Sequence, residues 1–142
     1  MRLLLVGVVL LWTAALTVFD VRHRRLPNAL TLPGAVAVLA AAAWCGRGMP
    51  ALAGALGLAG LYLVVHLMIP AGLGAGDVKL ALGVGGLTGA FGPDVWLLAA
   101  LGAPVLTAMA SVVLAARDPT ATVPHGPSMC VASLAAAALA VF

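Results

Sequence analysis

Long apolar runs, interrupted by prolines, glycines and charged residues, divide the chain into six segments. They cover residues 3–19, 29–45, 51–69, 78–91, 95–116 and 127–142. An α-helix needs ~20 apolar residues to cross a bilayer, and most of the segments approach that length. The pattern therefore predicts an all-α polytopic membrane bundle of about six transmembrane helices over residues 1–142.

The fourth segment, residues 78–91, is short and rich in glycine. It can cross the membrane fully only if the bilayer thins there or if neighbouring helices shield it. A second run of small residues, "AGALGLAG", occurs in the third segment. Small residues let two helix backbones approach closely, so we expect tight packing between these two segments.

Composition supports a membrane protein. The 142 residues are 64% hydrophobic and only 8% charged, whereas a soluble domain of this length carries about 25% charged residues. Too few polar residues remain to cover a water-facing surface. The net charge of +3 is therefore interpreted as a topology signal. Because no basic patch contains interleaved aromatic residues, we expect the lipid bilayer as a partner and no nucleic acid.

The basic residues are distributed unevenly between the loops. The loops at 20–28, 70–79 and 117–126 contain Arg22, Arg24, Arg25, Lys79 and Arg117. The opposite side contains only Arg2 and Arg47. Short cytoplasmic loops carry an excess of Lys and Arg, so we expect these three loops to face the cytoplasm. Both termini should then lie outside, in a multi-pass protein of the plasma membrane.

The four acidic residues are all aspartates, and the predicted topology separates them. Asp20, Asp77 and Asp118 fall on the cytoplasmic side, and Asp94 falls on the other. A pore or transporter is expected to carry polar groups at several depths along the permeation path. Polar groups gathered at one face favour chemistry at the membrane surface. A small transporter or channel subunit and a non-catalytic secretion-system scaffold remain the alternatives.

Two of these aspartates are candidates for catalysis. Asp77 precedes an apolar helix, so it can act simply as a helix N-cap. Asp20 ends a helix, where the dipole disfavours an anion, although nearby arginines can offset this. Two carboxylates brought close together cannot both ionise cheaply, so one holds a proton while the other activates water. This arrangement suits aspartyl peptide hydrolysis, but spacing alone does not establish that the two helices touch.

The sequence gives no sign of a metal site or another cofactor. His23, His66 and His125 all fall toward the cytoplasmic side, but no two share helical spacing and HExxH is absent. Cys45 and Cys130 lie far apart and form no CxxC pair. We therefore predict no metal, no cofactor and no disulfide bond.

Three motifs resemble those of the type IV prepilin peptidases. "DVRHRRLPN" (20–28) is similar to the first signature of that family, an Asp followed by a basic stretch and Leu-Pro-Asn. "GAGDVKLALGVGGLTG" (74–89) resembles the second, GxGDxKL with spaced glycines. "VPHGPSMCVA" (123–132) resembles the Pro-Phe-Gly-Pro element. The motifs occur in the order of the family and cover nearly the whole chain.

The resemblance implies a function in protein secretion or type IV pilus assembly. Residues 1–142 would form a single integral-membrane peptidase domain of the GxGD aspartic type, with Asp20 and Asp77 as the catalytic pair. It would cut the basic leader of prepilin-like precursors on the cytoplasmic side, usually after a glycine. The remaining motif residues would support the site: Pro27, Asn28, Gly74, Gly76, Lys79, Gly126 and Pro127.

The chain departs from the family pattern in two ways. It lacks the amino-terminal cytoplasmic segment with cysteine pairs of the long enzymes, so it resembles the short form and is not expected to methylate its product. His125 stands where Phe is usual. Presenilin-like proteases also carry GxGD, but they are longer and have a Tyr-Asp pair that this sequence lacks.

Overall fold

Six α-helices and their short connections make up residues 2–141, which the computed structural model describes. The helices are α1 (Arg2–His23), α2 (Asn28–Trp44), α3 (Gly48–Met68), α4 (Ala75–Gly89), α5 (Pro93–Ala115) and α6 (His125–Val141). Met1 and Phe142 lie outside the described residues, as do the side chains of Arg2 and Leu3. The predicted all-helical class is confirmed for the described residues.

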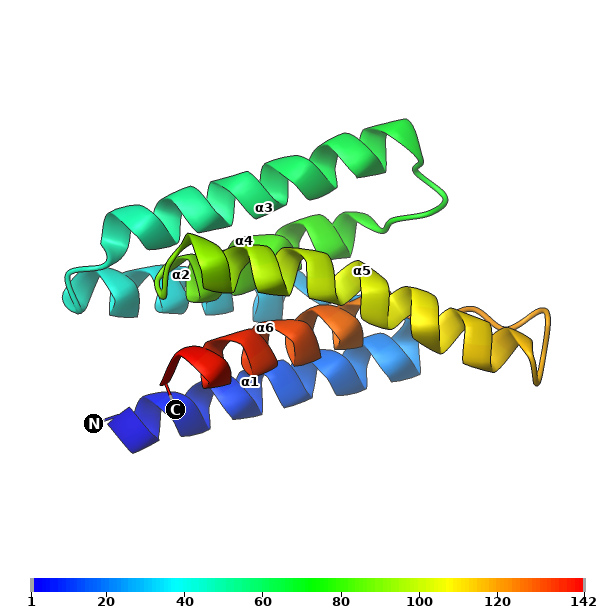
Figure 1. Cartoon of the computed structure of the whole chain (residues 1–142), viewed down its shortest axis with the longest axis horizontal. Helices are drawn as coiled ribbons and strands as arrows, with labels where there is room; N and C mark the ends of the chain where they lie inside the picture. Colours follow the sequence, from blue (N-terminus) through cyan, green and yellow to red (C-terminus); the bar gives the residue numbers. More distant parts are fainter. Residues whose placement is uncertain (1, 142) are drawn as a thin grey trace.

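Consecutive helices run in opposite directions (Figure 1). The three longer connections, residues 24–27, 69–74 and 116–124, meet at one end of the bundle. We call this the long-loop end. The two shorter connections, residues 45–47 and 90–92, lie at the opposite end with both chain termini. The three loops predicted to share one face of the membrane thus lie together.

Three helices are long and apolar enough to cross a bilayer. Their candidate spans are Leu4–His23, Gly48–Met68 and Pro93–Ala115. Helices α2 and α6 are shorter apolar helices of 17 residues each, and α4 has 15 residues. Six membrane crossings therefore remain a prediction. Helix α4 also begins at Ala75, three residues before the predicted segment, because Gly74 is extended and serves as its N-cap.

Glycines allow α4 to pack closely against its neighbours. A Cβ atom added at Gly85 would lie 2.6 Å from the Gly54 carbonyl oxygen, and one at Gly89 would lie 2.7 Å from the Pro50 carbonyl oxygen. Such separations are too short for any Cβ atom, so α3 and α4 can approach this closely only through glycine. The predicted close packing of the third and fourth segments is confirmed.

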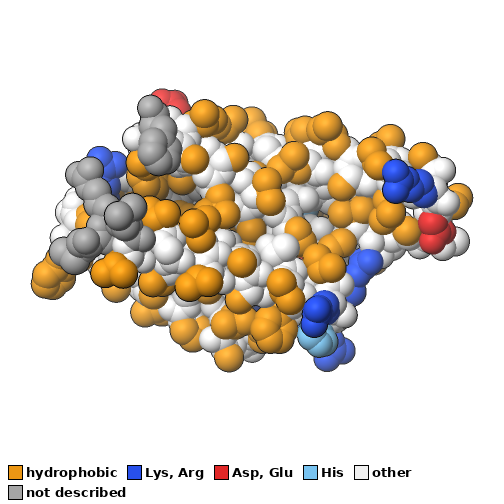
Figure 2. All heavy atoms as spheres, turned by 90° about the horizontal axis from the view of Figure 1, so that it is seen from below, with side chains coloured by type: hydrophobic (Ala, Val, Ile, Leu, Met, Phe, Trp, Pro, Cys, Tyr) orange, Lys and Arg blue, Asp and Glu red, His pale blue; other side chains and the backbone are white. Residues whose placement is uncertain are grey.

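Apolar side chains also cover the outside of the bundle. Exposed leucines and valines occur on α1, α3 and α5, among them Leu11, Leu67 and Val112. Figure 2 shows hydrophobic side chains along the length of one face, with charged side chains toward its two ends. In the described core, the hydroxyls of Thr13 and Thr88 donate to carbonyl oxygens of their own helices. This distribution indicates a membrane protein, and it does not favour a polar permeation path.

Candidate active site

A cavity of about 290 Å³ opens at the long-loop end. One part of its wall comes from the end of α1 and the loop after it, with Asp20, Arg24, Arg25 and Leu26. The other part comes from the start of α4, with Gly74, Ala75, Gly76, Asp77 and Lys79. Two motifs separated by about fifty residues therefore form one site, and both candidate aspartates line it.

Asp20 is buried, with a relative exposure of 7%. The backbone N–H of Gly126 donates a hydrogen bond to Asp20 Oδ2, with an N–O distance of 3.0 Å. Gly126 lies in the first turn of α6, where backbone N–H groups have no partner inside the helix and the dipole favours an anion. The start of α6 thus offsets the unfavourable position of Asp20 near the end of α1.

Gly126 fits this role because it has no side chain. A Cβ atom at this position would collide with Asp20 Oδ2 and would lie 3.1 Å from Asp20 Cγ. The N–H group can approach the carboxylate only through a glycine. The contact joins the third motif to the first across 106 residues of sequence.

Asp77 is the third residue of α4 and not its N-cap. The N-cap is Gly74, whose backbone N–H interacts with the Asp77 carboxylate. A carboxylate in the first turn of a helix meets the positive end of the helix dipole. The simple interpretation of Asp77 as an N-cap is therefore corrected, because Asp77 lies inside the first turn and Gly74 is the N-cap.

Burial and, to a smaller extent, the nearby charge of Asp20 together raise the pKa of Asp77 to about 6, against the lowering effect of the Gly74 N–H. Asp77 precedes the apolar segment that starts at Val78, so it lies at the boundary of the membrane-embedded region. The two carboxylates are thus close enough to influence each other's ionisation. A carboxyl group that titrates near neutral pH is suited to acid–base chemistry.

The other motif residues have separate contacts. Lys79 Nζ donates to Asn28 Oδ1 at 2.7 Å, which links the first two motifs. Pro27 is the N-cap of α2, and its carbonyl oxygen accepts from the N–H of Leu30 at 3.0 Å. Gly74 and Gly76 line the cavity. Pro127 lies in the first turn of α6, outside the described cavity wall.

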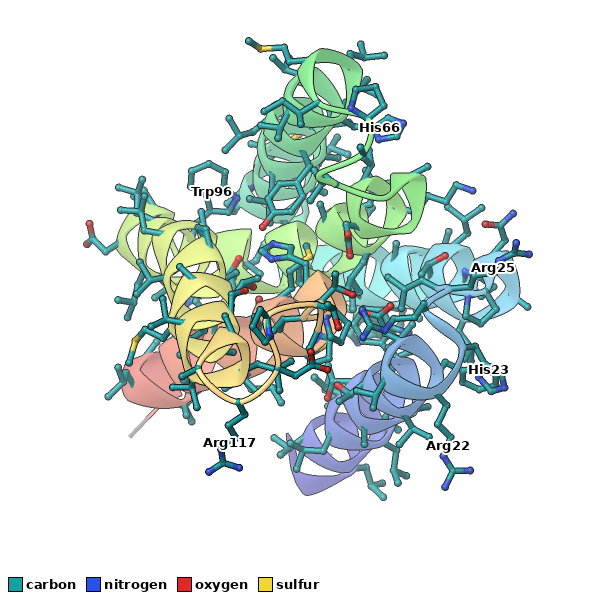
Figure 3. All side chains as sticks on the ribbon, turned by 90° about the vertical axis from the view of Figure 1, so that its right-hand side faces the viewer. Arg22, His23, Arg25, His66, Trp96 and Arg117 are labelled. Carbon is teal, nitrogen blue, oxygen red and sulfur yellow. The ribbon has the colours of Figure 1, made fainter. Side chains whose placement is uncertain are left out.

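The sequence did not identify Arg24, Arg25 and Leu26 as part of the cavity wall. Arg24 has a φ of +52°, a left-handed conformation that is uncommon outside glycine. Its guanidinium group donates to Thr122 Oγ1 at 2.7 Å and to the Thr122 carbonyl oxygen at 2.6 Å, and so joins two loops. The sequence signal for these three residues was their place in the first motif, four to six positions after Asp20. Around this end, Arg22, His23 and Arg117 point outward (Figure 3).

The three histidines have different partners. His23 packs against Phe19, with ring centroids 5.5 Å apart. His66 Nδ1 hydrogen-bonds to the Leu73 carbonyl oxygen at 2.6 Å, and His125 contacts α3 and α5. Among the described residues, no three His, Cys, Asp or Glu side chains form a metal-binding group. Cys45 is exposed and Cys130 is buried, and both are free.

The sequence was compared with known families, curated proteins and solved structures. The model of the type IV leader peptidase family matches residues 7–142. The chain belongs to the type IV leader peptidase family. No curated protein and no solved structure matches it significantly. The family match spans all three motifs and confirms the resemblance seen in them. Membership in this peptidase family, together with three long apolar helices, indicates a membrane protease.

Proposed function

We propose that the protein is a membrane aspartic endopeptidase that removes the basic leader of type IV prepilin-like precursors at the cytoplasmic face. The observation that carries the proposal is that Asp20 and Asp77, from separate motifs of a leader peptidase, line one cavity. The proposal assigns them as the catalytic pair.

The proposed reaction uses the two carboxyl groups as a unit. The ionised carboxylate takes a proton from water while the water oxygen attacks the carbonyl carbon of the scissile peptide bond. The protonated carboxyl group donates its proton to the carbonyl oxygen, giving a tetrahedral intermediate. When the intermediate collapses, the C–N bond breaks and the leaving amine takes up a proton from the pair. The raised pKa of Asp77 supports this assignment, because one member of the pair must hold a proton.

The glycines of the second motif would give the substrate backbone room. Gly74 and Gly76 line the cavity beside Asp77. Without side chains, they allow an extended peptide to approach the carboxylate. Gly76 also packs against Leu26, since a Cβ atom there would lie 3.1 Å from Leu26 Cβ. We therefore expect the scissile bond to lie between the start of α4 and the end of α1.

The charges of the cavity constrain how a basic leader would bind. Arg24, Arg25 and Lys79 line the wall, so a cationic residue next to the scissile bond would meet like charge. A small uncharged residue such as glycine suits this position. The basic residues of the leader would then lie farther out, toward the cytoplasmic lipid headgroups. The excess of Arg and Lys at the long-loop end supports a cytoplasmic site.

The proposal is tested with purified protein and a synthetic precursor that has a basic leader, a glycine and an apolar helix. We expect one cut after the glycine, identified by mass spectrometry of both products. A precursor with Lys in place of that glycine is the matched control and should be cut poorly. Folded protein that leaves the glycine precursor intact in lipid would contradict the proposal.

A further inference from the structure

We propose that His125 is a positioning residue that aims the Gly126 N–H at Asp20. The proposal rests on the function proposed above, because it assigns His125 to the support of the catalytic pair. His125 is the first residue of α6, and the residue after it donates the hydrogen bond to Asp20 Oδ2. His125 itself lines no part of the cavity wall described here. Its effect would be exerted entirely through its neighbour.

The imidazole ring of His125 is held from two sides. Nε2 lies 2.7 Å from the hydroxyl oxygen of Tyr62 on α3. Nδ1 lies 2.6 Å from Thr107 Oγ1 on α5. Both are hydrogen-bond distances, and the ring is half-buried between these helices. The start of α6 is therefore joined to two other helices through a single side chain.

A neutral ring protonated at Nδ1 gives Tyr62, His125 and Thr107 each a hydrogen-bond partner. The Thr107 hydroxyl donates its single proton to the Ala103 carbonyl oxygen at 3.1 Å. In this tautomer Thr107 Oγ1 accepts from His125 Nδ1–H. Nε2 is left with a lone pair that accepts the Tyr62 O–H. Burial lowers the pKa of His125, which favours this neutral form. Donors and acceptors form one directed chain from α3 through α6 to α5.

This chain controls the direction of the Gly126 N–H because of peptide geometry. The Gly126 nitrogen belongs to the planar peptide unit that begins at the Cα atom of His125. Holding the ring from two sides limits how that unit can rotate. On the other side, the space beside Gly126 is filled by Asp20, with no room for a Cβ atom. A small rotation would move the N–H away from Oδ2 and displace the carboxylate.

The experiment uses His125→Phe, which keeps an aromatic ring but removes both hydrogen bonds. The hydroxyl groups of Tyr62 and Thr107 then lose their hydrogen bonds to the imidazole ring, in a partly buried site. We expect kcat for precursor cleavage to fall about tenfold and KM to stay within about twofold. Hydrogen exchange of the Gly126 amide, measured by NMR in micelles, should become faster. His125→Gln, which offers an acceptor and a donor on one side chain, should recover part of both losses.

Trp96→Phe is the matched control. The Trp96 indole N–H donates to the Gly54 carbonyl oxygen at 2.9 Å, a hydrogen bond between helices that lies far from the cavity wall. Its loss should lower the melting temperature without changing kcat or Gly126 exchange. The proposal is wrong if His125→Phe behaves like this control, with a lower melting temperature but wild-type kcat and wild-type Gly126 exchange.

Variants of Tyr62 and Thr107, and the exchange rate of the Gly126 amide, test the proposal in two further cases. If His125→Phe does not fold, Tyr62→Phe and Thr107→Val each remove one of the bonds and should each lower kcat about threefold. Wild-type kcat in both would overturn the proposal. If the wild-type protein cleaves no precursor, the proposed function fails, whereas Gly126 exchange still decides whether His125 positions this N–H. Unchanged exchange in His125→Phe would then overturn the positioning role alone.

Discussion

Each of the two aspartates has its carboxylate near the start of a helix. Asp20 accepts from the Gly126 N–H in the first turn of α6, and Asp77 lies in the first turn of its own helix, α4. The positive ends of two helix dipoles therefore point toward the cavity. They favour negative charge there, while burial of Asp77 opposes it. The balance keeps a carboxyl group titrating near neutral pH.

The Gly126–Asp20 contact predicts that Gly126→Ala abolishes most of the activity. The added methyl group would collide with Asp20 Oδ2 and must push the carboxylate aside. A displacement of about 1 Å in a catalytic group can cost about 100-fold in rate. Cleavage assays of Gly126→Ala should show a loss of this order. Gly7→Ala is the control, because nothing lies within 4 Å of an added Cβ there; equal activity in the two variants would argue against the contact.

The raised pKa of Asp77 predicts a pH-dependent effect on stability. The ordinary pKa is 3.8 and the folded value is about 6. Between these values the unfolded chain has released the proton and the folded chain still holds it, so the free energy of unfolding falls as pH rises. Asn carries no charge, so Asp77→Asn should melt above wild type at about pH 8 and approach it near pH 4. A variant less stable than wild type at the higher pH contradicts the assigned shift.

Among the elements, α4 is the most closely packed helix, and it carries the GxGD motif with Asp77. Gly85 and Gly89 lie against the α3 backbone, and Gly83 faces the ring of Trp12 on α1. Leu80, Ala81 and Val84 are buried in the core. Because the helix is held along its length, its first turn has a fixed position relative to α1. Close packing of α4 is thus a condition for keeping Asp77 beside Asp20.

This packing predicts that Gly85→Ala destabilises the protein. The new Cβ atom would lie 2.6 Å from the Gly54 carbonyl oxygen and 2.8 Å from Leu58 Cβ. Overpacking of this kind costs about 1–3 kcal/mol. Thermal unfolding in detergent should show a lower melting temperature. Gly60→Ala on α3 meets nothing within 4 Å and, as a helix-interior Gly→Ala change, should stabilise by about 0.5–1 kcal/mol. Similar shifts in both variants would be inconsistent with the close approach.

The sequence predicted the elements better than their contacts. Hydrophobic runs showed the six helices, and the glycines showed which pair packs closely. The start of α4 was placed too late because Ala75, Gly76 and Asp77 carry no apolar signal, although they are helical. The left-handed conformation of Arg24 could not be read from a run of basic residues. The Gly126–Asp20 hydrogen bond joins residues 106 positions apart, so it depends on the assembled bundle.

At the scale of the whole molecule, the two ends of the bundle differ in their content of Arg and Lys. Arg22, Arg24, Arg25, Lys79 and Arg117 belong to the long-loop end. At the opposite end, Arg47 donates to the Ala90 carbonyl oxygen at 2.8 Å, just after α4. Such contacts stabilise the end of a helix. The difference supports the predicted orientation, with the cavity toward the cytoplasm.

The orientation predicts which cysteine reacts from outside the cell. Cys45 is exposed in the 45–47 connection, at the end opposite the long-loop end, and Cys130 is buried in α6. A thiol reagent that cannot cross membranes should label Cys45 in intact cells, and Cys45→Ser should remove the label. If Cys45 reacts only after the cytoplasmic face is opened, the orientation is the reverse of the one proposed.

The central claim is that Asp20 and Asp77 act together as the catalytic pair. Cleavage of a precursor by Asp77→Asn, in membranes where its abundance is confirmed, tests this claim most directly. Asn has nearly the same shape as Asp and the N-cap is Gly74, so the helix start should survive, but an amide cannot exchange protons as a carboxyl group does. We expect no cleavage by Asp77→Asn or Asp20→Asn, and a double variant little worse than either. Exposed Asp94 and Asp118 serve as controls, and their Asn variants should remain active. An Asp77→Asn protein that still cuts the precursor would contradict the account.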